Sequence, residues 1–239
     1  MASRIQVPGF SPKPADPCFC RSGKTFGGCC GSKAEDRMPP GGVMVFPGHV
    51  DEATCSKWVK RLERQPRLRA AVKDINNPDL LVEDPTRVCD DVKPGPMRKV
   101  LFDRVVEGFQ KTVPATGRGI AWYEVPRILR YQAGGFYKRH SDSCQIDKRL
   151  NQWFKVMDRD LSLLIYLNDD FEGGGLTFTH FNYHYRPRPG DLLIFPSDNR
   201  YIHQAEKVTS GLRYVIASWA AFTHSPRVCD APPDYAIHL

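Results

Sequence analysis

Apolar residues in the first half of the chain recur every three or four positions, which is the spacing of one face of a helix. One such stretch predicts a helix from Asp51, which can cap it, to about Gln65, where Pro66 follows. A second predicts a helix from about Met97 to Val113. Both helices are amphipathic, so we expect each to pack one face against the rest of the protein.

The second half of the chain changes to short β-rich runs separated by Gly-, Pro- and Asp-containing turns. A short strand is also expected at 43–48, and the proline-containing stretch 66–96 is expected to be a loose connection. Strands that follow two helices predict a mainly β protein with flanking helices, an antiparallel sandwich or barrel with helices on one side. The predicted strands are 125–132, 161–168, 176–181, 191–196, 201–208 and 212–222.

The N-terminal segment differs in composition from the rest of the chain. It is rich in Pro and Gly, it holds four of the eight cysteines, and it ends in the run Pro-Pro-Gly-Gly, which interrupts regular structure. We expect this segment to make few contacts with the remainder and to be separable from its chemistry. The predicted division is a segment with linker at 1–42 and a domain at 43–239, with helical support at 43–120 and a strand-rich core at 121–224.

Composition narrows the class of protein. The chain has 239 residues, of which 41% are hydrophobic, enough for a folded core without disulfides. No run approaches the ~20 apolar residues of a membrane span, and the N-terminus lacks the apolar stretch of a secretory signal. We expect a cytoplasmic protein with no membrane association, whose cysteines are thiols or metal ligands. The net charge of +7 favours acidic partners such as nucleic acid or a ribosome, although a basic enzyme surface explains it equally well.

A candidate metal site lies in the strand-rich half. His140 and Asp142 are two residues apart, so in an extended strand they point to the same face. His203, in a later predicted strand, supplies a third donor. Two histidines and one carboxylate that leave coordination positions open form the facial triad of non-haem Fe(II) oxygenases.

A positively charged side chain follows His203 at a spacing that could place both residues at one site. Arg213 lies ten residues after His203, across the turn Thr-Ser-Gly. If the two strands form a hairpin across this turn, both side chains can share one face. A guanidinium there can pair in a bidentate way with the distal carboxylate of a dicarboxylic acid.

The same segments carry a family resemblance. RYQAGGFYKRHSDS, DRDLSLLIYLNDDFEGGGLTF and RPRPGDLLIFPSDNRYIHQAEKVTSGLRYVIASWAAF resemble the prolyl 4-hydroxylase-type Fe(II)/2-oxoglutarate dioxygenases over about residues 125–222. The resemblance implies a double-stranded β-helix (jelly roll), with His140, Asp142 and His203 as iron ligands. It also implies Arg213 as the catalytic anchor of 2-oxoglutarate, and ascorbate as a supporting reductant.

The resemblance also implies supporting residues and a reaction. Tyr166 and Tyr131 are expected to contact 2-oxoglutarate, and Tyr137 is a weaker candidate at the pocket mouth; packed aromatic residues are the alternative for each. Oxidative decarboxylation of 2-oxoglutarate to succinate and CO₂ would be coupled to hydroxylation of a C–H bond. The segment 143–160 is expected to give the pocket a basic, partly aromatic rim formed by Lys148, Arg149, Trp153 and Lys155. Such a rim suits an extended polypeptide, an acidic partner or single-stranded nucleic acid, and a solvated charged loop is the alternative.

The second constellation is the cysteine-rich run PCFCRSGKTFGGCCGS. Four thiolates within thirteen residues can form a tetrahedral Zn(II) site, and the intervening glycines permit the turns this requires. The run resembles the SEC-C motif, best known from the bacterial translocation ATPase, which implies zinc and docking to proteins or ribosomes. A purely structural zinc site and a redox-labile thiol cluster are the alternatives. The cysteines are Cys18, Cys20, Cys29 and Cys30.

Three functions therefore stay open. The leading prediction is hydroxylation of a peptidyl prolyl residue, with a protein or peptide as the substrate. A second is a non-catalytic docking protein that uses the zinc segment and the basic surface. A third is a hydroxylase of a free amino acid or small metabolite. The sequence leaves the oligomeric state undetermined.

Overall fold

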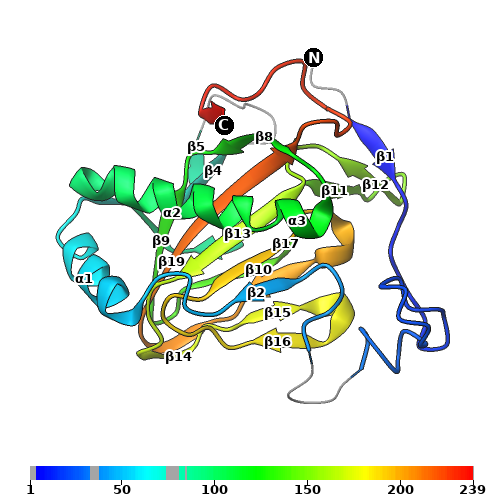
Figure 1. Ribbon diagram of the computed structural model, residues 1–239, viewed down its shortest axis with the longest axis horizontal. Helices are drawn as coiled ribbons and strands as arrows, with labels where there is room; N and C mark the ends of the chain where they lie inside the picture. The colour runs from blue at the N-terminus through cyan, green and yellow to red at the C-terminus, as the bar shows by residue number, and fades with distance from the viewer. Residues whose placement is uncertain (1–3, 33–37, 74–80, 84, 239) are drawn as a thin grey trace.

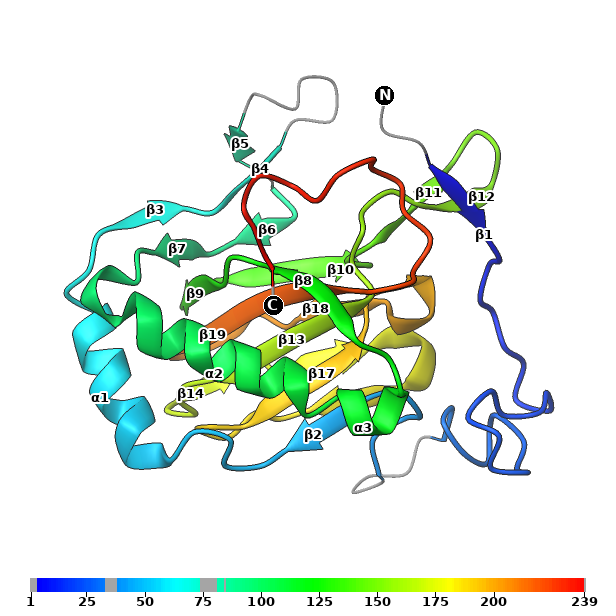
Figure 2. The ribbon, with the colours of Figure 1, turned by 45° about the horizontal axis from the view of Figure 1, so that its top comes forward.

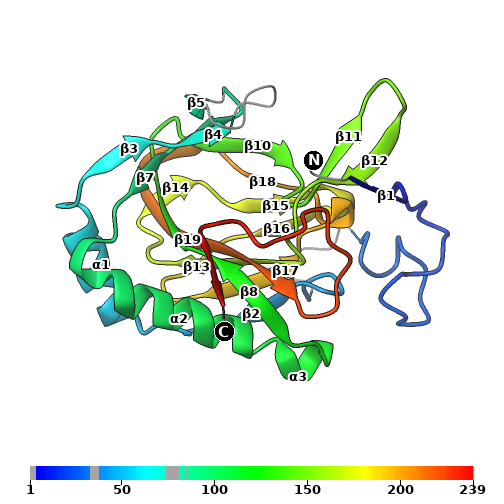
Figure 3. The same ribbon diagram turned by 90° about the horizontal axis from the view of Figure 1, so that it is seen from above.

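The computed structural model describes residues 4–32, 38–73, 81–83 and 85–238. Two sheets face each other, and helices cover the outer side of the larger one (Figures 1 and 3). Within the described residues, no helix combines the length and apolar character needed to cross a membrane. The helices are α1 (Glu52–Leu62), α2 (Arg98–Gln110) and α3 (Val113–Thr116), with 3₁₀ turns η1 (Gly95–Met97), η2 (Thr179–Phe181) and η3 (Asn199–Tyr201).

The larger sheet is antiparallel and is built around β19, the longest strand described. Strands β14 (Phe171–Gly173) and β8 (Ile120–Glu124) also pair with β19, and β20 (Ala236–His238) pairs with β8. The main path runs in the order β2 (Met44–Phe46), β17 (Leu192–Pro196), β13 (Leu161–Tyr166), β19 (Val208–Phe222), β9 (Arg127–Gln132), β7 (Asp90–Val92) and β3 (Arg67–Arg69).

The smaller sheet closes the other side of the barrel (Figure 3). Its order is β16 (Tyr183–Tyr185), β15 (Leu176–Phe178), β18 (His203–Ala205), β10 (Phe136–His140) and β6 (Arg87–Val88). The remaining described strands form two small sheets. One has the order β1 (Ile5–Val7), β12 (Gln152–Lys155) and β11 (Cys144–Asp147), and the other pairs β4 (Ala71–Lys73) with β5 (Leu81–Glu83).

The period-2 alternation of the strands produces two separate apolar cores. On β19, Tyr214 and Ile216 pack with the helices, whereas Val215 and Trp219 face the space between the two sheets. β13, β9 and β17 alternate in the same way. The sequence pattern thus fixes which residues enter the barrel, and Arg213 falls on the inward face.

The jelly-roll prediction is confirmed, and the predicted helices are present with ends a few residues shorter. The expected loose connection at 66–96 is wrong, because its described part contributes β3 and β7 to the large sheet and β6 to the small one. The expected hairpin between the strands of His203 and Arg213 is also wrong. β18 pairs with β15 and β10, whereas β19 lies in the opposite sheet, so the two side chains approach across the barrel.

The N-terminal segment lies against one end of the barrel (Figure 2). β1 pairs with β12, and the Asn199 side chain donates to the Pro8 carbonyl at 2.8 Å. Phe19 stacks on Phe181 with ring centroids 5.4 Å apart. The expectation of few contacts is therefore wrong: aromatic residues of the segment bury themselves on the domain. The boundary near residue 42 stays a prediction.

Candidate active site

The structure brings the three predicted metal ligands together. His140 ends β10 and His203 begins β18, and these two residues are direct partners in the antiparallel ladder. Asp142 lies two residues beyond the end of β10. One donor atom from each of the three residues lies within 4.8 Å of the others. The two rings have centroids 4.3 Å apart, so both imidazoles flank the same carboxylate.

Backbone carbonyls orient both histidines. Nδ1 of His140 lies 2.8 Å from the Lys138 carbonyl, and Nδ1 of His203 lies 2.9 Å from the Tyr201 carbonyl. Because a carbonyl only accepts, each Nδ1 carries the proton, which leaves the Nε2 lone pair free. The two Nε2 atoms are 3.4 and 3.6 Å from the Asp142 oxygens. This is the arrangement in which an outer hydrogen bond fixes the tautomer of a metal-binding histidine.

Asp142 is buried, and serine hydroxyls hold its carboxylate in place. The Ser162 hydroxyl donates to its Oδ2 at 2.6 Å, and Ser162 in turn contacts the Ser197 hydroxyl at 2.7 Å. Burial by itself would raise the pKa of Asp142, but His203 and His140 beside it outweigh this and lower its pKa well below the ordinary value. Burial lowers the pKa of His203 to about 4. A carboxylate and neutral imidazoles are the forms that bind a divalent metal.

Arg213 lies in the same barrel interior. It is 1% exposed, and its Nε and Nη1 have no hydrogen-bond partner among the described residues. The Tyr166 hydroxyl is likewise buried without one. The guanidinium carbon lies 4.7 Å from the Tyr131 ring centroid and 5.2 Å from that of Tyr166. A buried guanidinium with unused donors is costly unless an anion completes it, so these residues fit the carboxylate of a ligand.

Comparisons with known proteins agree with this geometry. The sequence profile of the 2OG-Fe(II) oxygenase superfamily matches residues 126–221, which span both ligand segments and Arg213. Residues 126–221 are thus similar to the 2OG-Fe(II) oxygenase superfamily.

Two curated relatives carry prolyl hydroxylase names. A protein of Acanthamoeba polyphaga mimivirus, provisionally named a prolyl 4-hydroxylase, is 30% identical over 137 residues, which cover 53% of this chain and 54% of that protein. Human prolyl 3-hydroxylase 2 is 35% identical over 96 residues, covering 36% of this chain and 13% of that protein. The chain thus spans about half of the first relative and a small part of the second.

Solved structures share the fold. A prolyl-4-hydroxylase of Pseudomonas putida superposes with a TM-score of 0.55 at 17% identity, covering 75% of this chain and 92% of that one. A Trichoplax adhaerens prolyl hydroxylase, in complex with a peptide fragment of the hypoxia inducible factor oxygen degradation domain, gives 0.56 at 18% identity, covering 75% and 83%.

The candidate site contains groups that the sequence analysis missed. Arg87 on β6 is buried, its Nε has no described partner, and its guanidinium carbon lies 4.9 Å from the Tyr137 ring centroid. Tyr137 stacks on His140 with centroids 3.7 Å apart, so Arg87 lies behind a candidate metal ligand. β6 is two residues long within a stretch interpreted as a loop, so no periodicity marked it. Ser162 and Ser197 gave no motif either.

The expected basic rim is only partly present. The segment 143–160 folds into the β11–β12 hairpin, whose side is covered by β1. Lys155 is buried, with its ammonium 3.1 Å from an Asp160 oxygen and 2.9 Å from the Pro226 carbonyl, so it is wrong as a rim residue. Lys148 and Arg149 lie in the exposed turn.

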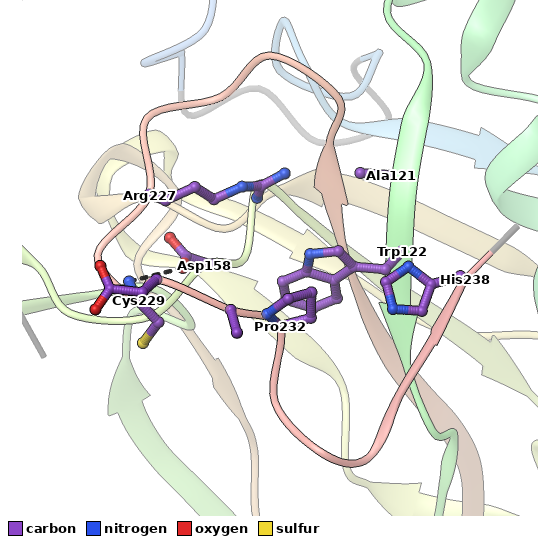
Figure 4. Close-up of a pocket in the computed structure, with 9 residues that line it drawn as sticks. Ala121, Trp122, Asp158, Arg227, Cys229, Pro232 and His238 are labelled. Atoms are coloured by element: carbon purple, nitrogen blue, oxygen red, sulfur yellow. Dashed lines mark hydrogen bonds between the residues drawn. The ribbon is translucent and has the colours of Figure 1, made fainter.

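A separate cavity of about 260 Å³ lies under the C-terminal segment (Figure 4). Trp122, Arg227 and His238 line it, and its lining includes none of the triad residues. Asp158 at its wall accepts from the Val228 and Cys229 backbone N–H groups, which ties down the C-terminal segment. These contacts explain the cavity as a feature of chain packing.

The four cysteines of the N-terminal segment converge as predicted. Each offers a sulfur within 4.8 Å of the others. The Sγ of Cys20 lies 3.3 Å from that of Cys18 and 3.5 Å from that of Cys29. A hydrogen bond from Ser22 contributes most to lowering the pKa of Cys20, to about 6. Such a thiol ionises readily, which suits a thiolate ligand.

Proposed function

We propose that this protein is an Fe(II)- and 2-oxoglutarate-dependent dioxygenase that hydroxylates a peptidyl prolyl residue and releases succinate and CO₂. The observation that carries the proposal is that one barrel holds both the His140–Asp142–His203 cluster and the buried guanidinium of Arg213, whose Nε and Nη1 have no hydrogen-bond partner among the described residues. The cluster supplies donors for a metal, and the guanidinium supplies a site for the far end of a dicarboxylate.

Each residue has a defined task in this proposal. His140, Asp142 and His203 would hold Fe(II), which when bound supplies the activation of O₂ that drives the oxidation. Arg213 would pair with the distal carboxylate of 2-oxoglutarate. Burial raises the pKa of Tyr166, so its hydroxyl stays protonated and can donate to the same carboxylate. The Tyr131 ring centroid lies 4.7 Å from the guanidinium carbon, and the ring would help to hold Arg213 in position.

A peptide is the proposed substrate class. The relatives are named as prolyl hydroxylases, and one structural neighbour is described in complex with a peptide. Association with a ribosome or nucleic acid rests on the net charge of +7 and stays a prediction, as does a cytoplasmic location.

We further propose that Cys18, Cys20, Cys29 and Cys30 bind Zn(II). Support comes from the convergence of four sulfurs in one small cluster. Four thiolates leave no open coordination position, so this site would be structural rather than catalytic.

The test is turnover by the iron-reconstituted full-length protein. Succinate should form from 2-oxoglutarate, and a lysate treated with enzyme should contain peptides that gain one oxygen at proline, read by mass spectrometry. His203→Ala should abolish both signals. Oxidised free amino acids without oxidised peptides would exclude a peptide substrate. If no succinate forms under any condition, the enzymatic proposal is rejected in favour of the non-catalytic docking function.

A further inference from the structure

The cysteine-rich segment packs on η3, the 3₁₀ turn that ends two residues before His203. Tyr201, two residues before this ligand, is 3% exposed and lies between the segment and the barrel. Its ring packs against the stacked pair of Phe19 and Phe181, with centroids 6.4 Å and 5.3 Å away. Phe19 lies between Cys18 and Cys20, so the residue that separates two of the thiols is itself in the interface.

A continuous path of hydrogen bonds joins the two clusters. The Gly41 N–H donates to the Cys30 sulfur at 3.3 Å, and the Tyr201 hydroxyl donates to the Gly41 carbonyl at 2.6 Å. The Tyr201 carbonyl in turn accepts the Nδ1 proton of His203 at 2.9 Å. One glycine, Gly41, and one tyrosine, Tyr201, therefore connect a cysteine of the first cluster to an imidazole of the second.

The backbone at Gly41 and Gly42 is tightly packed against Cys20 and Tyr201. A side chain at Gly41 would come within 2.5 Å of the Cys20 Cβ. One at Gly42, whose φ is +91°, would come within 2.1 Å of the Tyr201 hydroxyl oxygen. Only glycine allows the backbone to approach both groups at this distance. The position of Tyr201 is consequently set by how the cysteine segment is folded.

We propose that the cysteine cluster positions His203 through Gly41 and Tyr201, so that filling the cluster with Zn(II) strengthens metal binding at the triad. Tyr201 is then a positioning residue. The hydrogen bond from His203 Nδ1 fixes the ring that presents Nε2, and such outer contacts set the affinity of a metal site. A four-cysteine cluster without its metal loses the structure around Gly41, which frees Tyr201 and the carbonyl it presents.

This inference rests on the proposed function, and the experiment separates the two. Mn(II) is titrated into the full-length, zinc-containing protein, and free Mn(II) is followed by its EPR signal. Mn(II) favours nitrogen and oxygen donors over thiolates, so it reports the triad rather than the cysteines. His203→Ala must remove the binding; if it does not, the triad assignment fails whatever the cysteines do.

Three variants then test the path. Tyr201→Phe removes only the hydroxyl that bonds Gly41, and we expect it to weaken Mn(II) binding by roughly 3- to 10-fold, less than the about 10- to 100-fold for a direct partner. Tyr214→Phe also removes a buried tyrosine hydrogen bond, to Glu63 on the opposite side of the sheet, and should leave the Mn(II) affinity unchanged. Cys20→Ser/Cys29→Ser should lose about one zinc and weaken Mn(II) binding at least as much as Tyr201→Phe.

The combined variant decides between a path and two separate defects. If the cluster acts through Tyr201, adding Tyr201→Phe to the double cysteine variant should cause no further loss, because contacts in one network are not additive. Wild-type Mn(II) affinity in the zinc-free variant would overturn the proposal. Additive losses would also overturn it. If the cysteine variant does not fold, Tyr201→Phe against Tyr214→Phe decides alone, and equal affinities reject the coupling.

Discussion

At the scale of single residues, the site is marked by buried polar groups that lack hydrogen-bond partners among the described residues. A buried cation without partners is destabilising, and a fold retains one where a ligand supplies the counter-charge. Arg213 is such a group, whereas the neighbouring buried Arg130 is paired with Glu63 at 2.8 Å and Asp90 at 3.3 Å. Two arginines in adjacent strands thus have opposite electrostatic situations, and only one is available for an anion.

This contrast gives a prediction for the co-substrate. Arg213→Leu should raise the 2-oxoglutarate concentration needed for half-maximal succinate formation by one to a few orders of magnitude, since losing one partner of a buried charge pair costs about 2–5 kcal/mol. The same variant without co-substrate should have a higher Tm, because the unpaired charge is gone. Arg130→Leu should lower the Tm and leave the 2-oxoglutarate requirement near wild type. An unchanged requirement in Arg213→Leu would show that another cation binds the carboxylate.

Ser162 provides a second residue-scale prediction. Its hydroxyl orients Asp142, so Ser162→Ala should weaken Mn(II) binding at the triad by about 10- to 100-fold. The matched control is Ser218→Ala, which removes an equally buried hydroxyl that donates to the Glu124 carbonyl at 2.7 Å. Calorimetric titration of both variants checks this. Equal Mn(II) affinities in the two variants would mean that metal binding does not depend on the hydrogen bond from Ser162 to Asp142.

At the scale of elements, strand periodicity predicted which residues enter the barrel but not which strands pair. Val215 and Trp219 of β19 face the barrel interior, which is the face that strand alternation also assigns to Arg213. Pairing depends on sheet topology, which spacing along the chain does not encode. β18 has three residues and β6 has two, too few for any period to appear. The position of Arg87 therefore could not be derived from the sequence, although the convergence of His140, Asp142 and His203 could.

Arg87 supports a prediction at this scale. β6 pairs with β10, and this pairing sets Arg87 opposite Tyr137 in the ladder. The guanidinium is a second buried positive charge beside Tyr131 and Tyr137, and it would attract a dianionic 2-oxoglutarate bound at Arg213. Arg87→Gln should raise the 2-oxoglutarate requirement by roughly 3- to 10-fold, the equivalent of about 1 kcal/mol. Succinate formation measured across 2-oxoglutarate concentrations checks this, with Arg127→Gln, which breaks an outer ion pair to Asp91, as the control. A change in Arg127→Gln as large as in Arg87→Gln would contradict the assignment.

At the scale of the whole molecule, the cysteine-rich segment is part of the structure that holds the site. Composition suggested an appendage on a Pro-Gly linker, because proline and glycine form no regular element. The same residues permit close packing, however, and the aromatic residues between the cysteines fill the end of the barrel. Composition reported the lack of secondary structure correctly and said nothing about the interface.

Deleting residues 1–40 tests this view. The deletion exposes Phe181 and Tyr201, which are buried in the full chain. Losing the burial of a large side chain costs about 1.5–3 kcal/mol, so two of them cost at least about 3 kcal/mol. With about 2–4 °C of Tm for each kcal/mol in a domain of this size, thermal unfolding should begin at least about 6 °C lower. Mn(II) affinity of the folded remainder should fall as well, because the Gly41 carbonyl no longer has a fixed position to meet Tyr201. A truncated protein with wild-type Tm and wild-type Mn(II) affinity would restore the interpretation of the segment as an independent appendage.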